Sequence, residues 1–407
     1  MNISIDTSLV SDEAEPLLAA IRELAPAINA RVAEIEAGRR LPLDLVQKLR
    51  SIGVFRMLAP RSHGGLELDL PAAVEILTAL ARIDGSVGWC ATITSGASIV
   101  AALLPPQTYE QIYRNGPDVI LAGSATTPGG TAEAAPGGWR VNGRWPFASG
   151  CQHADWLAGL CVMKKGGEHL PGPAGEKGPP MVRCFVLPAG EWQIEDTWYV
   201  AGLKGSGSHH ISVEDKFVPA GNFFDFAQGV SSLPGPLYRA PLSLLPLLLS
   251  AVAVGIAEGA LHELVAQANT GWQQQRAATP ARESELFQFE LGRTEADIRA
   301  ARAFLHCQAE RYWRDALGRT LRNDALSLQA VQVSQAAAWV NATSVRAVDA
   351  CFALGGGTAI YASSPLQRRM RDLHVAAQHA AVQQRNFASA GKQLLENSLP
   401  QGAVQGR

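Results

Sequence analysis

The order in which the hydrophobic pattern changes along the chain constrains the fold more than any other feature. Residues 11–114 carry apolar side chains at spacings of three and four, which indicates helices. Residues 118–226 change to short β-prone runs separated by Gly, Pro and Asn turns, a pattern typical of consecutive strands. Residues 238–397 return to long helical periodicity. The sequence therefore predicts a helical block, a strand block and a second helical block.

A chain of 407 residues is too long for one ordinary hydrophobic core, so several domains are expected. The pattern changes place these domains at residues 1–117, 118–230 and 231–407. Inside the strand block, the stretch "KKGGEHLPGPAGEKGPP" (164–180) is rich in Gly and Pro and is predicted to form an exposed, mobile loop.

Three long helices are predicted in the last block. Two of them cover residues 283–317 and 324–354, and the glycine triplet Gly355, Gly356 and Gly357 is expected to end the second. The third is "RRMRDLHVAAQHAAVQQR" (368–385), which begins on a cationic run and carries two histidines but no acid after Asp372.

Composition excludes several classes of partner. The formal net charge is −2, and no basic excess or polybasic cluster indicates nucleic acid or an anionic membrane. The acidic N-terminus lacks the pattern of a signal peptide. The longest apolar stretch (240–261) is interrupted by Pro241, Pro246 and Glu258, so a buried core helix is expected rather than a membrane span. Six scattered cysteines without a CxxC pair predict buried thiols in a reducing cytoplasm and no metal site.

Four local motifs, each in the zone that suits it, carry a resemblance over nearly the whole chain. They are "RWPFASGCQHADW" (144–156), "GLKGSGSHHISVEDKFVP" (202–219), "ELGRTEADIRAARAFL" (290–305) and "ALGGGTAIYASSPLQRRMRDLH" (353–374). With these motifs the chain resembles the acyl-CoA dehydrogenase superfamily. The resemblance implies an α+β, mainly α, fold: a helical N-domain, a central β-barrel and a C-terminal four-helix bundle. It also implies a homotetramer, with a flavin between the β-domain and the bundle.

The chain departs from the dehydrogenases at the catalytic base. Those enzymes need a carboxylate to remove a weakly acidic α-proton from an acyl thioester. Their glutamate commonly lies eight residues after the Asp of an "RD" pair, where this chain has Ala380. The alternative position, on the first helix of the bundle, corresponds to residues 243–253, which contain no acid. Glu258 and Glu263 lie further along and remain candidates for a relocated base.

His379 lies seven residues after the "RD" Asp, and this resembles the flavin-dependent monooxygenases of the same superfamily. The branch implies that reduced FMN or FAD arrives from a separate NAD(P)H-dependent flavin reductase. O2 then forms a C4a-hydroperoxide, which hydroxylates a small hydrophobic or aromatic substrate. An imidazole titrates near neutrality, so His379 could accept a substrate proton or hydrogen-bond the peroxide. No GxGxxG follows a predicted strand, which favours a reductase on another chain.

The resemblance assigns further residues to the flavin. Ser149 falls where the superfamily places a hydroxyl against flavin N5, beside Phe147 at the position of a stacking aromatic ring. The backbone of Ala122 and Gly123, together with Ser124, is expected along the pyrimidine ring. Arg276 and the glycine triplet are expected at a flavin phosphate, sometimes across a subunit interface. Each has a plainer alternative, such as a turn-capping serine, a helix-ending glycine or a buried helix histidine.

A substrate pocket is predicted around Trp89, Ile93 and Ser98. Phenol-hydroxylating relatives tend to carry a histidine on this helix about ten residues after "GW", and Ser98 replaces it here with a smaller, less basic roof. Structural roles are expected for four other histidines and for an Arg371–Asp372 ion pair; these histidines are His153, His209, His210 and His374. Two alternatives stay open: an acyl-CoA dehydrogenase with a relocated base, and a catalytically silent binding protein.

Overall fold

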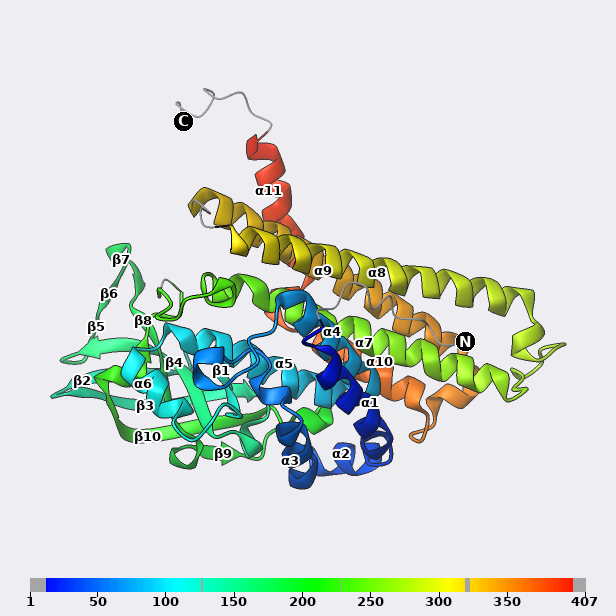
Figure 1. Ribbon diagram of the computed structural model, residues 1–407, viewed down its shortest axis with the longest axis horizontal. Coiled ribbons are helices and arrows are strands. Elements are labelled where there is room, and N and C mark those ends of the chain that lie inside the picture. Colours follow the sequence, from blue (N-terminus) through cyan, green and yellow to red (C-terminus); the bar gives the residue numbers. More distant parts are fainter. Residues whose placement is uncertain (1–11, 126, 228, 319–322, 398–407) are drawn as a thin grey trace.

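The computed structural model describes residues 12–125, 127–227, 229–318 and 323–397 of the chain (Figure 1). Its first part is helical, as the periodicity predicts. The helices are α1 (Glu15–Asn29), α2 (Val32–Gly38), α3 (Leu43–Ser51), α4 (Leu70–Ile83), α5 (Gly85–Val100) and α6 (Pro106–Tyr113).

The two central helices of this part, α4 and α5, begin on aspartate caps. The side chain of Asp69 accepts a hydrogen bond from the backbone N–H of Ala72 at 2.7 Å. The side chain of Asp84 caps α5 in the same way and accepts hydrogen bonds from backbone N–H groups of the first turn of this helix. Gly88 lets the two helices approach closely, because a Cβ at this position would lie 2.6 Å from Ala81. The helix that carries Trp89 is therefore fixed against α4.

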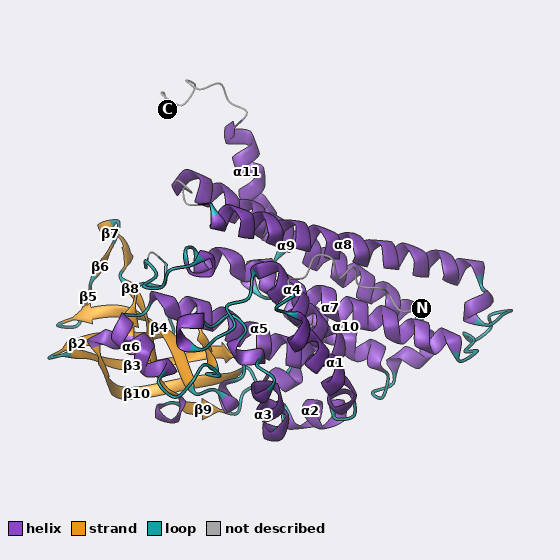
Figure 2. Cartoon of the chain, viewed as in Figure 1, coloured by secondary structure: helices purple, strands orange, loops and turns teal. Residues whose placement is uncertain are grey.

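The strands gather at one end of the molecule, as Figure 2 shows in orange. They are β1 (Leu121–Ser124), β2 (Gly130–Ala135), β3 (Gly138–Ala148), β4 (Trp156–Lys165), β5 (Glu168–His169), β6 (Pro171–Gly172), β7 (Gly175–Pro180), β8 (Val182–Pro188), β9 (Gln193–Glu195), β10 (His209–Pro219) and β11 (Phe223–Phe224).

Nine of these strands form one mixed sheet with the path β11-β8-β4-β2-β3-β10-β9, to which β1 and β5 add by pairing with β4. β1 and β2 each run parallel to β4, and the other pairs are antiparallel. Within the described ranges the end strands β11 and β9 do not pair with each other. The closed barrel that the resemblance implies therefore stays a prediction.

The predicted loop at 164–180 is wrong in one respect. The segment is largely exposed, as expected, but it forms β5 and the separate two-stranded sheet of β6 and β7, which projects from the strand domain (Figure 1). Positive φ values at Gly166, Gly167 and Gly175 make its tight turns. Glycines that suggested an irregular loop serve here as hairpin turn residues.

The last part of the chain is a helical bundle. Its helices are α7 (Pro241–Asn269), α8 (Glu285–Leu317), α9 (Asn323–Leu354), α10 (Pro365–Ala376) and α11 (Phe387–Asn397). The two long helices predicted for residues 283–317 and 324–354 are thus confirmed. Two segments, Gly85–Leu103 and Pro241–Asn269, are long and apolar enough to cross a membrane, but 83% and 94% of their most apolar windows are buried inside the protein. The second is the core helix expected at 240–261.

The prediction of a single helix over residues 368–385 is wrong. α10 ends at Ala376, and two 3₁₀ turns follow, η12 (Ala380–Val382) and η13 (Gln384–Asn386). His379 has the extended angles φ −64° and ψ 129° and caps the first of these turns. Its ring is therefore oriented by a cap and not by a helix face.

Candidate active site

Trp89 on α5 joins the two residues that the sequence predicts to be catalytic. Its indole Nε1–H donates to Ser149 Oγ at 3.0 Å. The centroid of its ring also lies 6.0 Å from that of His379, at an interplanar angle of 64°. Residues from all three parts of the chain therefore meet at one buried tryptophan.

Ser149 lies in the turn that follows β3. Two left-handed residues shape this turn, Phe147 with φ 65° and Gly150 with φ 76°. Ser149 is buried, and its Oγ lies 2.7 Å from Ser208 Oγ. Ser208 Oγ in turn lies 2.7 Å from Ser206 Oγ. The hydroxyl of Ser149 thus belongs to a buried polar chain and does not cap its own turn.

The backbone fixes the tautomer of His379. Its Nδ1 accepts a hydrogen bond from the backbone N–H of Ala381 at 3.2 Å. A nitrogen that accepts carries no proton, so the neutral ring holds its proton on Nε2. Burial lowers the pKa of His379 below its ordinary value, because the charged ring is desolvated. At neutral pH, His379 is therefore an uncharged hydrogen-bond donor through Nε2.

The first strand of the domain offers a donor without a partner. Ser124 Oγ on β1 is buried and has no hydrogen-bond partner. Its neighbour Gly123 has φ 150°, and a Cβ there would lie 2.4 Å from the carbonyl oxygen of Ala158. Ala122 is buried in the same strand. A buried hydroxyl without a hydrogen-bond partner, on a tightly paired strand, could bond the polar edge of a planar ligand.

Phe147 presents a ring where a planar ligand could stack. Its side chain is 59% exposed, although it is a large aromatic group at the end of a strand. Trp198 and His210 meet it edge to face, with centroids at 6.3 Å and 6.5 Å. The ring is therefore supported from the side while it stays accessible.

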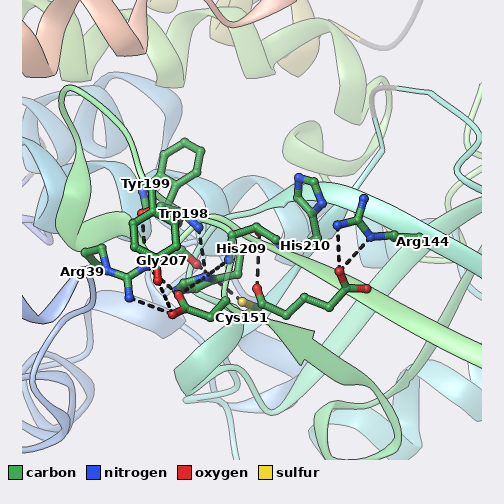
Figure 3. A network of polar contacts seen from close by, with 11 residues as sticks. Arg39, Arg144, Cys151, Trp198, Tyr199, Gly207, His209 and His210 are labelled. Atoms are coloured by element: carbon green, nitrogen blue, oxygen red, sulfur yellow. Dashed lines mark hydrogen bonds and ion pairs between the residues drawn. The ribbon is translucent and has the colours of Figure 1, made fainter.

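A polar network holds the segment that carries Ser206 and Ser208 (Figure 3). His209 Nδ1 accepts from the backbone N–H groups of Thr197 and Trp198, at 3.2 Å and 3.3 Å. Asp196 lies 3.6 Å from the same nitrogen and pairs with Arg39. Burial lowers the pKa of His209, which keeps it a neutral acceptor.

Neighbouring residues of a strand point to opposite faces of the sheet, and His209 and His210 do so in Figure 3. His209 is buried, whereas His210 is partly exposed and lies beside Phe147. His153 is partly buried, and desolvation lowers its pKa to about 4. His374 is exposed and bonds Asp349 at 2.8 Å.

The residues predicted at the flavin phosphate do not join this cluster within one chain. Gln274 Nε2 donates to the carbonyl oxygen of Leu354, which holds the Arg276 loop against the glycine triplet. Arg276 itself is exposed, with φ 64°. The α7–α8 connection lies at the end of the bundle away from the strands (Figure 1). Arg276 and the triplet therefore form a second, separate group.

The predicted substrate residues differ in what they offer. Ile93 is partly exposed, but Ser98 has no exposed surface, and its Oγ donates to the carbonyl oxygen of Ser95. The indole N–H of Trp89 is used by Ser149. Trp89 and Ile93 can thus supply apolar surface, whereas Ser98 offers a ligand no group.

The two candidate bases are held by arginines. Glu258 Oε1 accepts from Arg302 at 2.6 Å, and its Oε2 lies 3.8 Å from Arg82. Arg302 also bonds Glu75, deep between α4, α7 and α8. Glu263 lies 3.8 Å from Arg369. These carboxylates serve ion pairs of the bundle.

The prediction of an ion pair between Arg371 and Asp372 is wrong. Arg371 bonds Glu36 at 3.0 Å, whereas Asp372 accepts the backbone N–H of Leu203 at 2.6 Å. Burial, followed by repulsion from Asp84, raises the pKa of Asp372 to about 7. Asp372 therefore attaches α10 to the loop that precedes Ser206.

Ser206 and Ser208 are the site residues that sequence reasoning missed. Both lie in the motif "GLKGSGSHHISVEDKFVP", but neither received a role. Their alternation around a glycine was the available signal. Among the residues described, no group of three or more His, Cys, Asp or Glu side chains could hold a metal ion. Cys307 is exposed, which corrects the expectation that all thiols are buried.

Two family models match the chain. The acyl-CoA dehydrogenase N-terminal domain matches residues 11–111, and the acyl-CoA dehydrogenase C-terminal domain matches residues 247–384. Indole-3-acetate monooxygenase of Pseudomonas putida is 35% identical over 380 residues, which cover 93% of this chain and 92% of that protein. The oxygenase subunit HsaA, a flavin-dependent monooxygenase of Mycobacterium tuberculosis, is 31% identical and covers 92% and 94%.

Solved structures agree with these matches. XiaF from a Streptomyces species, in complex with FADH2 and glycerol, superposes with a TM-score of 0.83 at 25% identity, covering 95% of this chain and 97% of that one. The HsaA crystal structure gives the same TM-score at 29% identity, covering 95% and 98%.

Proposed function

The chain belongs to the acyl-CoA dehydrogenase family, in the branch of its flavin-dependent monooxygenases, and we propose that it is the oxygenase component of a two-component hydroxylase. One observation supports this function over dehydrogenation. The site around Trp89 contains a hydroxyl and a neutral imidazole donor, and both candidate carboxylate bases are held by arginines. A site of this kind suits oxygen activation better than removal of an α-proton.

The residues present fit a flavin. Ser124 has a buried hydroxyl without a partner, Gly123 permits close backbone approach, and Phe147 has an exposed ring suited to stacking. We propose that these groups, with Ala122 and Ser149, hold the isoalloxazine. Reduced flavin, when bound, supplies the electrons that activate O2.

Within this arrangement, His379 has a single role that its tautomer permits. Its Nε2–H would donate a hydrogen bond toward the oxygen being transferred, because its Nδ1 is occupied by Ala381. Trp89 orients this side of the site and contributes to the exclusion of water. Donors act more strongly in a dry, low-dielectric site than in solution.

The second group of residues supports assembly from several copies. Arg276 is exposed, and Gln274 holds its loop against the glycine triplet, at the end of the bundle away from the strands. Large apolar side chains are exposed on the neighbouring helices, among them Leu286 and Phe289 on α8. We propose a homotetramer in which this group reaches the flavin phosphate of another subunit.

The relatives indicate the remaining partners. HsaA is named an oxygenase subunit. The FADH(2)-dependent resorcinol hydroxylase of a Rhizobium species, 28% identical over 398 residues, is named an oxygenase component, and both names imply a reductase on another chain. We propose that a separate NAD(P)H-dependent reductase supplies reduced FMN or FAD in the cytoplasm. The names indole-3-acetate monooxygenase and resorcinol hydroxylase favour a small aromatic substrate, in keeping with the apolar surface of Trp89 and Ile93.

The test uses the purified chain with an added flavin reductase and NADH. Indole-3-acetate and resorcinol would be supplied in turn, and hydroxylated product and H2O2 would be measured together. We expect product with one aromatic substrate and a matching decrease in H2O2.

The same protein loaded with oxidised flavin would be mixed anaerobically with a short acyl-CoA. Bleaching of the flavin by the acyl-CoA would contradict the proposal and return Glu258 and Glu263 as candidate bases. Failure to bind either redox state of FMN or FAD would instead favour a silent binding protein.

A further inference from the structure

The carboxylate of Asp84 connects the two helices that lead to Trp89 and His379. Its Oδ1 accepts hydrogen bonds from the backbone N–H groups of Ser86 and Val87, at 2.9 Å and 3.0 Å, and so begins α5. Its Oδ2 accepts from Nη1 of Arg368 on α10 at 2.6 Å. The two paired side chains are only 3% and 7% exposed. The start of the helix that carries Trp89 is therefore bonded directly to α10.

His379 is attached to the other end of α10 by backbone hydrogen bonds. Its N–H donates to the carbonyl oxygen of Ala376, the last residue of the helix, at 3.2 Å. Arg368 lies in the first turn of the same helix. A change in the way α10 lies against its neighbours is therefore passed on to His379. Asp84 holds one end of this helix, and the other end presents the imidazole.

The other polar contacts of α10 reach different elements. Arg369 donates to two carbonyl oxygens at the end of α4, at 3.1 Å and 3.0 Å. Arg371 and Asp372 hold α2 and the loop before β10. In the described part of the chain, Arg368 is thus the side chain of α10 that bonds the cap of α5. These neighbouring contacts fix α10 against other elements, and Arg368 fixes it against the helix of Trp89.

The two helices also approach each other closely beside this ion pair. A Cβ at Gly85, the first residue of α5, would lie 3.2 Å from Oδ2 of Asp372. Further along α5, the ring centroid of Trp89 lies 6.0 Å from that of His379. The α5 and α10 segments therefore meet at two places, the buried ion pair and the proposed active site. The first contact can set the geometry of the second.

We propose that Arg368 is a positioning residue, which holds α10 against the start of α5 and thereby sets where His379 lies relative to Trp89. The inference rests on the proposed function, in which Nε2–H of His379 donates toward the oxygen being transferred. Such a donor acts fully only at the right distance, and a misplacement of about 1 Å can lower a rate about a hundredfold. Arg368 acts on this distance through Asp84.

A double substitution separates positioning from stability. Arg368→Met or Asp84→Ser alone leaves one buried charge without its partner, which should lower the free energy of unfolding. The double variant carries neither charge, and its serine can still cap α5, so it should regain most of the lost stability. The attraction between α10 and α5 stays absent. We therefore expect stability to recover in the double variant while the position of His379 does not.

Diethylpyrocarbonate at neutral pH reports the position of His379 without any flavin, because it acylates accessible neutral histidines. Trypsin releases residues 372–385 as one peptide, which carries both His379 and the exposed His374, so fragment masses give the ratio of the two acylation rates. We expect the His379 to His374 ratio to rise about tenfold in the double variant, the effect on local opening of losing one ordinary contact. With reductase, flavin and an aromatic substrate, product formed per O2 should fall by about tenfold.

Arg56→Met combined with Asp118→Ser is the matched control, because this pair, at 2.6 Å, also joins distant segments but bonds no residue of α5 or α10. It should change neither measurement. Arg368→Lys keeps the charge for this single hydrogen bond and should keep the wild-type ratio.

An unchanged acylation ratio in the folded double variant would overturn the positioning role, as would a raised ratio with unchanged product per O2. If the double variant does not fold, an equal rise of the ratio in Arg368→Lys and Arg368→Met would overturn it, since the charge would then not hold α10. A wild-type protein that forms no product would contradict the proposed function, whereas the acylation ratio still tests the placement of His379 by Arg368.

Discussion

The orientation of the His379 ring decides whether this residue accepts a proton or donates a hydrogen bond. The sequence leaves both open, since an imidazole near neutrality can accept a proton or donate a hydrogen bond. The bond from Ala381 N–H to Nδ1 closes the first route for the neutral ring and leaves Nε2–H as a donor. This distinction can be tested with two amides of different length.

Asn at position 379 can replace the cap, because its short side chain reaches the N–H of Ala381 as Nδ1 does. Gln reaches further and can place an N–H near the position of Nε2. We expect His379→Asn to fold normally but to lower the rate of product formation by about a hundredfold, the usual effect of losing one oriented donor.

His379→Gln should recover part of that rate. The measurement is the yield of product and of H2O2 under identical reductase supply. Equal loss in both variants would argue that the imidazole acts as a base.

The pH dependence follows from the lowered pKa of His379. Its ordinary value is 6.5, and desolvation moves it down. The neutral form therefore persists as pH falls through 6.5. At lower pH Nδ1 gains a proton, so it can no longer accept from the N–H of Ala381, and the cap that orients Nε2–H is lost. We expect product yield per O2 to stay constant from about pH 8 to about pH 6.5 and to fall below that. A decline that begins near pH 7.5 would contradict this assignment.

At the scale of elements, the join between α10 and the strand domain depends on one carboxyl. Asp372 accepts the backbone N–H of Leu203, and Gly202 allows the same contact, since a Cβ there would lie 2.2 Å from the carbonyl oxygen of Arg371. The pKa of Asp372 is raised to about 7, so the folded state holds this proton more tightly than the unfolded state. Its contribution to stability therefore grows as pH falls through 7 and is smallest in alkaline solution.

Substitutions at Asp372 test this join. Asp372→Asn keeps an acceptor for Leu203 without the buried charge, and we expect it to raise the free energy of unfolding above wild type at about pH 8. Asp372→Ala leaves the N–H of Leu203 unpaired and should lower the free energy of unfolding by roughly 1–3 kcal/mol. Urea unfolding at two pH values measures both. Greater stability of the alanine variant than of the asparagine variant would contradict the role of this hydrogen bond.

At the scale of the whole molecule, the helices of the bundle carry several exposed large apolar side chains. Phe289 is 64% exposed, and Trp339 packs edge to face on Phe304 while 37% of it stays exposed. Phe289→Arg combined with Trp339→Glu should reduce the proposed tetramer to smaller species, because burial of a charge opposes association. Light scattering after gel filtration measures the mass.

Leu43→Arg is the control, since Leu43 is equally apolar and 57% exposed but lies on α3. It should leave the mass unchanged. If the proposed contribution of Arg276 across subunits is right, the dissociated variant should also bind flavin more weakly. A wild-type protein that is already monomeric would contradict the assembly.

Periodicity was enough to predict the block order, the long helices α8 and α9 and the buried core helix α7. Ser149 and His379 were predicted from motifs that resemble those of a known family. Local backbone turns without a compositional signal could not be predicted in this way. "VAAQHAAVQQR" contains no Gly or Pro, so the end of α10 at Ala376 and the cap by His379 have no sequence marker. Ser206 and Ser208 become a polar chain only when β10, the preceding loop and Ser149 are placed together.

The contacts of Trp89 make the site a check on completed folding. Its indole belongs to the first helical part, its hydrogen-bond partner Ser149 to the strand domain, and its ring neighbour His379 to the bundle. A nascent or partly opened chain therefore lacks at least one of these three groups. Such a chain would not present the complete site to a flavin.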